Sequence, residues 1–195
     1  EYEIGSRIVG SEMCIRDSCL NIPIKILKKK SKEIIKVSGL KQFKSFDYKV
    51  PGDISSASFF IVLTILSKNS ILKIRNVNLN KTRTGIIEIL KKMNAKINIT
   101  NTKLYNGEFV GDIIVRSTNS LKSINCPKSL NTKSIDEFLI IFLTCAKAKG
   151  LSKFKGIGEL RNKESDRLKV ASNFLKMIGV KIKAVSYTHL RAHET

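Results

Sequence analysis

The chain has 195 residues, of which 42% are apolar and 27% charged, and its formal net charge is +20, a composition that excludes disordered and fibrous proteins. Four cysteines without a C-x-x-C pair and only two histidines favour neither a zinc site nor disulfides, so we expect no metal, no cofactor and a cytoplasmic location. The longest apolar runs fall well short of the ~20 residues that cross a bilayer, so we expect no membrane span.

The two ends of the chain differ in composition from its middle. Every lysine lies between Lys25 and Lys183, and both histidines lie in the closing segment. Residues 1–18 and 185–195 resemble peptides translated from sequencing-adapter DNA, so we expect both ends to be non-native and leave them out of the fold. A secretory signal is the alternative for the first end, but it lacks a continuous apolar stretch. We therefore expect a gene truncated at both ends.

Short strands are predicted before Pro51, at residues 22–27, 33–37 and 46–50. The sequence Val-Pro-Gly-Asp then fixes one φ angle and frees the next, which suits a hinge before a helix capped by Asp53 or Ser55. We place a domain boundary near residue 50, so that residues 19–50 are the last strands of one domain and residues 51–184 belong to a second domain.

From residue 51 onward the hydrophobic periodicity predicts the order helix, strand, helix, strand, and it does so twice. The first copy has helices at 54–67 and 84–94 and strands at 70–77 and 96–100. The second copy has helices at 135–149 and 165–178 and strands at 151–157 and 180–183. A further strand at 111–117, entered by a Gly-Asp turn, lies between the copies.

The two copies also match residue for residue at their ends. The sequence LKKMNAKINI matches FLKMIGVKIK, which places Met93 over Met177, 84 residues later. Asp53 and Asp136, 83 residues apart, open the two copies. A repeated unit of this kind indicates an α/β fold with mixed sheets and helices packed inside, in which the copies share one core.

The segment ELRNKESDRL, residues 159–168, is the strongest candidate site. In a helix that begins near Lys163, this lysine and Arg167 are four residues apart, and Glu164 lies between them. Two cations at a helix N-terminus can bind a phosphate or carboxylate while the carboxylic acid transfers a proton. Ordinary capping and surface ion pairs are the alternative, and the spacing alone favours them.

Asp136 and Glu137 form a second candidate, at the head of a helix that is apolar nearly all round. A carboxylate there can act as a general base, although Asp is also a favoured N-cap. The segment GDISSAS, residues 52–58, offers hydroxyls and backbone donors at a helix start, and a cap is again the simpler interpretation. Arg83 occupies in the first copy the place of Arg167 in the second, and we expect it to be structural.

Five motifs, GDISSASFF, NKTRTGIIEILKKMNA, GDIIV, IDEFLIIF and ELRNKESDRL, resemble in order and spacing the second half of the 5-enolpyruvylshikimate-3-phosphate (EPSP) synthase family. The resemblance covers residues 32–183, and the KESDR block is specific to this family. It implies an enolpyruvyl-transferase fold of two domains, each with three βαβαββ units, of which residues 51–184 contain about two. It also implies transfer of the enolpyruvyl group of phosphoenolpyruvate to the 5-hydroxyl of shikimate 3-phosphate, with release of phosphate, in aromatic amino acid biosynthesis.

The resemblance gives roles to the residues that match its motifs. Asp136 corresponds to the aspartate that accepts the proton of the shikimate hydroxyl, and Glu164 to the acid that exchanges protons at the phosphoenolpyruvate methylene carbon. Two carboxylates with opposite duties suit an addition followed by an elimination. Lys163 resembles the contact to the shikimate phosphate and Arg167 a phosphoenolpyruvate-binding arginine. Glu159 stands where some members use Asn against shikimate.

Several substrate-binding motifs of the family lie outside residues 19–183, so we expect the chain alone to show no turnover. The nearest alternative is the UDP-N-acetylglucosamine enolpyruvyl transferase, which lacks the KESDR block. A non-enzymatic basic nucleic-acid-binding module is the other, but the chain has only 7% aromatic residues and no Trp for base stacking. We expect the two substrates as partners, no nucleic acid, no membrane, and a monomeric intact enzyme.

Overall fold

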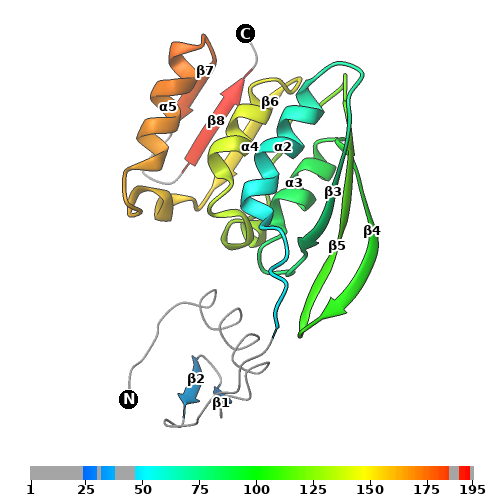
Figure 1. Cartoon of the computed structure of the whole chain (residues 1–195). Helices are drawn as coiled ribbons and strands as arrows, with labels where there is room; N and C mark the ends of the chain where they lie inside the picture. Colours follow the sequence, from blue (N-terminus) through cyan, green and yellow to red (C-terminus); the bar gives the residue numbers. More distant parts are fainter. Residues whose placement is uncertain (1–23, 30–31, 38–46, 185–188, 194–195) are drawn as a thin grey trace.

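The computed structural model of the chain describes residues 24–29, 32–37, 47–184 and 189–193 (Figure 1). Its strands are β1 (Ile24–Lys29), β2 (Lys32–Val37), β3 (Ile71–Asn78), β4 (Lys96–Tyr105), β5 (Glu108–Arg116), β6 (Leu151–Lys155), β7 (Lys181–Ala184) and β8 (His189–His193). Its helices are α2 (Ile54–Leu66), α3 (Gly85–Lys92), α4 (Phe138–Cys145) and α5 (Arg167–Met177), with 3-10 turns η1 (Lys128–Leu130), η2 (Thr132–Ser134) and η3 (Gly158–Arg161).

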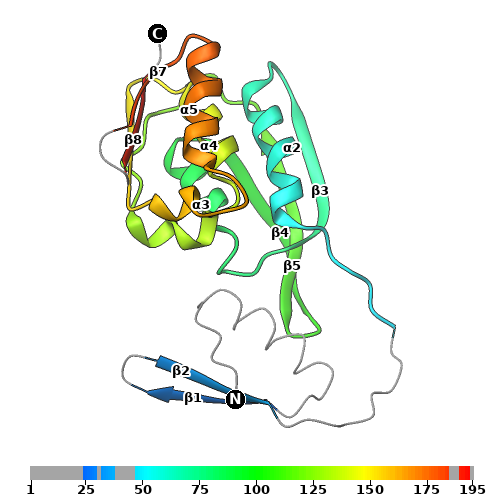
Figure 2. The same cartoon turned by 90° about the vertical axis from the view of Figure 1, so that its left-hand side faces the viewer.

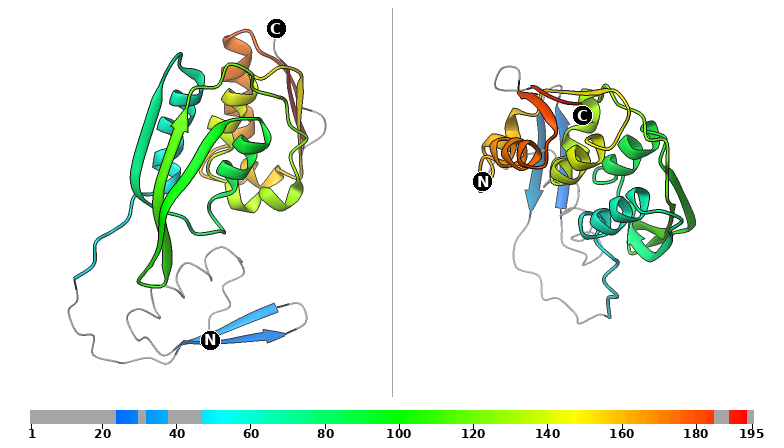
Figure 3. Two further views of the ribbon diagram at one scale, coloured as in Figure 1. Left: turned by 90° about the vertical axis from the view of Figure 1, so that its right-hand side faces the viewer. Right: turned by 90° about the horizontal axis from the view of Figure 1, so that it is seen from above.

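Two three-stranded antiparallel sheets enclose the helices. The strand orders are β3-β5-β4 and β6-β8-β7, while β1 and β2 form a separate antiparallel hairpin. Helix α2 packs against β3, β5 and α4, and α4 in turn packs against α5 and β8. Figure 2 shows α2, α4 and α5 between the two sheets, and in the left view of Figure 3 the β3-β5-β4 sheet lies in front of α2. The predicted packing of helices inside sheets is confirmed, but the sheets, which were expected to be mixed, have only antiparallel pairs between their named strands, and parallel pairing is limited to isolated bridges such as Gly52 with Val77.

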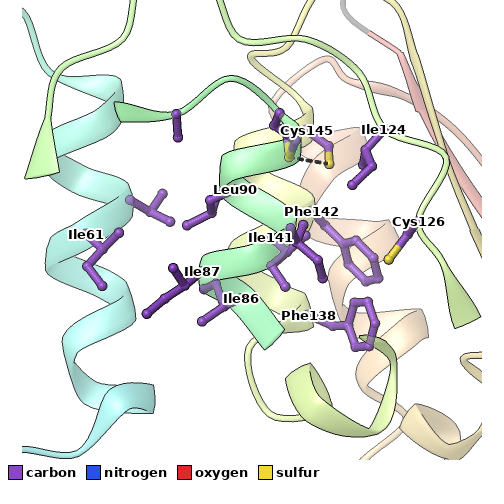
Figure 4. Packing of buried hydrophobic residues seen from close by; sticks show 14 of the residues in the cluster. Ile61, Ile86, Ile87, Leu90, Ile124, Cys126, Phe138, Ile141, Phe142 and Cys145 are labelled. Atoms are coloured by element: carbon purple, nitrogen blue, oxygen red, sulfur yellow. Dashed lines mark hydrogen bonds between the residues drawn. The ribbon is translucent and has the colours of Figure 1, made fainter. Parts of the chain in front are cut away.

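One hydrophobic core runs through both units (Figure 4). The ring of Phe154 meets Phe138 and Phe142 edge to face, with centroids 5.8 and 5.1 Å apart. Across the junction between the units, Cys145 Sγ lies 4.0 Å from Met93 Sδ. Since α4 packs on α2, and α3 packs on η1 and η2, the core is continuous across the junction between the units.

Two polar bulges curve the β3-β5-β4 sheet. The register shifts in β3 between Ile74 and Val77 and in β4 between Thr100 and Lys103. Asn76 and Asn101 lie inside these bulges with φ of 54° and 52°, the left-handed region that Asn tolerates.

The Asp112 carboxylate on the middle strand joins both bulges. It accepts hydrogen bonds from Asn76 N (3.0 Å) and Asn101 Nδ2 (2.8 Å), and it pairs with Lys73 Nζ at 3.0 Å. These contacts, the hydrogen bond from Asn101 foremost, lower the pKa of Asp112 to about 2.

Most of the predicted elements are present with ends shifted by a few residues, but the strand expected at 46–50 is not. Residues 47–50 have no regular structure, and residue 46 lies outside the described residues. The ring of Tyr48 packs on Tyr105 with centroids 5.7 Å apart, and Lys49 N donates to Tyr105 Oη at 3.0 Å. The predicted strand at 46–50 is therefore wrong for residues 47–50. The backbone N–H of Lys49, which a neighbouring strand would bind, is bound by the Tyr105 side chain of β4.

The closing segment contributes a strand that the sequence analysis did not assign. Strand β8 lies between β6 and β7 and pairs with both. His193 of β8 lies opposite Leu151 on one side and Lys181 on the other. Whether residues 185–195 are native stays a prediction, as does the domain boundary near residue 50. In the part of the chain that the structure describes, no helix combines the length and apolar composition needed to cross a bilayer.

Candidate active site

The N-terminal ends of α2 and α4 lie side by side and bring two distant motifs together. Asp53 caps α2, because its Oδ2 accepts a hydrogen bond from Ser56 N at 2.8 Å. Ser55 Oγ donates to Glu137 Oε1 at 2.5 Å. The GDISSAS segment is thus a cap, as predicted, and it is also a contact between the two units.

Three cations converge on the carboxylate of Asp136. Arg167 Nη1 lies 3.3 Å and Lys163 Nζ 3.8 Å from Oδ1, whereas Arg83 Nη1 lies 3.5 Å from Oδ2. The Asp136 side chain keeps 32% of its surface exposed. Capping does not account for this position, since the N-cap residue of α4 is Glu137 and its side chain makes no capping hydrogen bond. Asp136, Lys163 and Arg167, which the sequence analysis singled out separately, therefore form one cluster.

Arg83 belongs to this cluster, although the sequence analysis expected it to be structural. Besides its contact with Asp136, its Nη2 donates to Ser55 Oγ at 3.3 Å. A signal for this role was present in the sequence, because Arg83 and Arg167 are separated by 84 residues, the same offset that relates Met93 to Met177. The two copies of the unit thus each supply an arginine to one carboxylate.

The helix of the KESDR block begins later than predicted. The first helical residue is Arg167, and Asp166 is its N-cap, accepting from Lys169 N at 2.9 Å. Arg161 Nη1 holds the same Asp166 carboxylate at 2.9 Å. The expected helix start near Lys163 is therefore wrong, and Lys163 approaches Asp136 from the loop before α5.

The carboxylates of the cluster have different environments. Glu164 is 80% exposed and accepts from Arg167 Nη2 at 2.8 Å. A backbone hydrogen bond and the Arg167 guanidinium lower the pKa of Glu164. Glu137 is 3% exposed, and burial raises the pKa of its carboxyl against the opposing effects of Ser55 and Arg83. Glu159 is exposed on η3, outside this cluster.

A cavity of about 420 Å³ opens beside the cluster, and Arg83 lines it. Polar groups of Tyr48, Asp53, Asn78 and Glu108 also line this cavity. Among the residues that the structure describes, no three His, Cys, Asp or Glu side chains gather in a way that could hold a metal ion. The three cations around Asp136 suit anionic ligands, because arginine and lysine are the usual partners of phosphate and carboxylate groups.

Comparison with known proteins gives one consistent result. The family model of EPSP synthase (3-phosphoshikimate 1-carboxyvinyltransferase) matches residues 19–192. The chain is 47% identical over 138 residues to the 3-phosphoshikimate 1-carboxyvinyltransferase of Thermodesulfovibrio yellowstonii. These residues cover 71% of this chain and 32% of the relative. It is 45% identical over 150 residues to the protein of the same name from Carboxydothermus hydrogenoformans, covering 76% of this chain and 35% of the relative. The chain thus spans about a third of the length of these curated relatives.

Solved structures agree with the sequence relatives. EPSP synthase from Acinetobacter baumannii superposes with a TM-score of 0.83 at 30% identity, covering 99% of this chain and 42% of that one. The enolpyruvyl transferase NikO from Streptomyces tendae, at 15% identity, shares the fold with a TM-score of 0.63 over 95% of this chain and 39% of its own. The fold is therefore that of the enolpyruvyl transferases, and with the match over residues 19–192 the chain belongs to the EPSP synthase family.

Proposed function

We propose that the protein of which this chain is part transfers the enolpyruvyl group of phosphoenolpyruvate to the 5-hydroxyl of shikimate 3-phosphate. The products are 5-enolpyruvylshikimate 3-phosphate and phosphate, in the shikimate pathway to chorismate and the aromatic amino acids. The observation that carries this proposal is the carboxylate of Asp136 with Arg83, Lys163 and Arg167 within 3.3–3.8 Å. The names of the relatives in the preceding comparison support it. A cytoplasmic, monomeric enzyme remains our prediction.

The charges of the cluster explain how substrate binding prepares the base. Both substrates are anionic, so the phosphate of shikimate 3-phosphate pairs with Lys163, and phosphoenolpyruvate pairs with Arg167 through the planar fork of its guanidinium. Each pairing draws a cation away from Oδ1 of Asp136. With both cations engaged by the substrates, Oδ1 of Asp136 is left to accept a hydrogen bond from the substrate hydroxyl.

The reaction then needs one proton acceptor and one donor. The shikimate hydroxyl gives its proton to Asp136 as its oxygen bonds to C2 of phosphoenolpyruvate, and Glu164 gives a proton to the methylene carbon. The bond from C2 to the phosphate oxygen then breaks with release of phosphate, and the new methyl group returns a proton to the Glu164 carboxylate to restore the double bond. A backbone hydrogen bond and the contact with Arg167 lower the pKa of Glu164, so the turn of Arg167 to phosphoenolpyruvate removes one of the two contacts that oppose the donor role. Glu159 would accept a hydrogen bond from a shikimate hydroxyl.

Calorimetry of shikimate 3-phosphate binding to the 195-residue chain tests the proposal. We expect saturable binding that weakens about tenfold in Lys163→Ala, the scale of one charge-assisted hydrogen bond. Lys133→Ala is the matched control, because Lys133 is 38% exposed and its Nζ pairs with Glu88 at 3.8 Å. Equal losses in both variants would contradict the proposal. Binding of random-sequence DNA with a steep salt dependence, in place of shikimate 3-phosphate, would favour the basic module.

A further inference from the structure

The three cations around Asp136 are held in different ways. Lys163 and Arg167 reach Oδ1 from the segment that leads into α5, and Arg167 shares its other nitrogen with the exposed Glu164. Arg83 reaches Oδ2, and its other nitrogen is hydrogen-bonded to Ser55 at the start of α2. The two oxygens of the Asp136 carboxylate thus contact cations that are held by different neighbours, namely Ser55 for Arg83 and Glu164 for Arg167.

Behind Arg83, the hydrogen bonds form a chain with one direction. Arg83 Nη2 donates to Ser55 Oγ, so the Ser55 hydroxyl hydrogen is free to be donated to Glu137 Oε1. The chain ends on a carboxylate oxygen that is buried against α2, and a buried acceptor of this kind is costly to leave unpaired. Ser55 and Arg83 come from the first unit, whereas Glu137 is the direct neighbour of Asp136 in the second.

We propose that Glu137 and Ser55 are positioning residues that hold Arg83 as the permanent counter-ion of Oδ2 of Asp136, which leaves Lys163 and Arg167 to turn from Oδ1 toward anionic substrates. This inference rests on the proposed function for the roles of Lys163 and Arg167. The charged groups that face Glu137 are Arg83 from the loop before α3 and Asp136 beside it, and Asp53 at the start of α2 faces Arg83 in turn.

The two hydrogen bonds from Arg83 to Ser55 and from Ser55 to Glu137, here called the relay, keep the Asp136 carboxylate oriented when substrates bind. When both anions bind, the two cations on Oδ1 are engaged elsewhere, and a free Asp136 side chain would be able to rotate. Arg83 keeps one oxygen fixed, so the other stays aimed at the space that Lys163 and Arg167 leave. A catalytic group fixed in this way keeps the geometry on which proton transfer depends.

The test compares two neighbouring hydroxyls of α2 in the 195-residue chain. Ser55→Ala breaks the relay, Ser55→Thr keeps its hydroxyl, and Ser56→Ala removes a hydroxyl that donates to Asp53 Oδ2 at 2.9 Å outside the relay. The first readout is the nitrogen-15 NMR spectrum of the Arg83 guanidinium without substrate. We expect separate Nη1 and Nη2 signals in the unchanged chain, in Ser55→Thr and in Ser56→Ala, and one merged signal in Ser55→Ala, where the group rotates.

The second readout is the affinity for shikimate 3-phosphate, which we expect to fall about fivefold in Ser55→Ala, as for one lost hydrogen bond. In an Arg83→Met background the same change should have no effect, because a positioning residue acts only through the residue it holds. A merged signal in the unchanged chain, a Ser55→Ala spectrum with separate signals, or an undiminished effect in the Arg83→Met background would overturn the proposal. Since the spectrum needs no substrate, its result stands whether or not the ligand binds.

Discussion

Replacing Asp136 with Asn should destabilise the chain by removing the anion that three cations share. The contacts of 3.3, 3.5 and 3.8 Å join side chains that are 21–32% exposed, so each pair is worth well under its unscreened Coulomb energy. At about 0.5 kcal/mol for each pair, the free energy of unfolding should fall by about 1.5 kcal/mol at low salt. The isosteric amide keeps the shape of the side chain, so packing should change little.

Inorganic phosphate should reverse this loss, because Arg83, Lys163 and Arg167 surround the neutral amide only in the folded chain and can bind an anion there. A concentration of about one hundred times the dissociation constant restores about 2.7 kcal/mol. Urea unfolding with and without phosphate, in low and high sodium chloride, measures both effects, and Asp47→Asn serves as the control because Asp47 is exposed. If Asp136→Asn were as stable as the unchanged chain at low salt, or gained no more from phosphate, the cluster would not be an electrostatic unit.

Two further outcomes follow from the sheet and from the outer helix faces. The pKa of Asp112 is lowered to about 2, so its contacts stabilise the fold above the ordinary carboxyl range and are lost as the pH falls from about 4 toward 2. In Asp112→Asn, the free energy of unfolding measured in urea should therefore fall less steeply over this pH range. An unchanged pH dependence would contradict this. Met177 is 84% exposed whereas its repeat counterpart Met93 is fully buried, so Met177→Lys should reduce self-association by removing an exposed apolar group. Analytical ultracentrifugation measures this change, and an unaltered sedimentation profile would count against it.

Hydrophobic periodicity correctly located the helices and strands whose formation depends on the local sequence. The first helix, expected at 54–67, is found as Ile54–Leu66, because its buried positions recur every three to four residues and Asp53 caps it. The pattern failed where a distant side chain decides the structure, because Tyr105 binds the backbone near Lys49, 56 residues earlier. That partner cannot be read from the local sequence.

The candidate site divides in the same way. The KESDR block and Asp136 stood out by residue type and by family resemblance, and the structure brings Asp136, Lys163 and Arg167 together. The contact of Ser55 with Glu137 joins residues 82 positions apart, and it exists only because α2 and α4 pack side by side. Contacts of this kind follow from tertiary packing, which one sequence without an alignment does not reveal.

The two arginines that meet at Asp136 show where a function can arise when a unit is duplicated. Neither copy contains a complete site, because Arg83 comes from the first, whereas Asp136 and Arg167 come from the second. An ancestral single unit could have assembled the same three groups only by pairing with a second molecule of itself. Fusion into one chain would then have allowed the two halves to diverge, so that the first arginine became an anchored counter-ion and the second kept a partner that a substrate can displace.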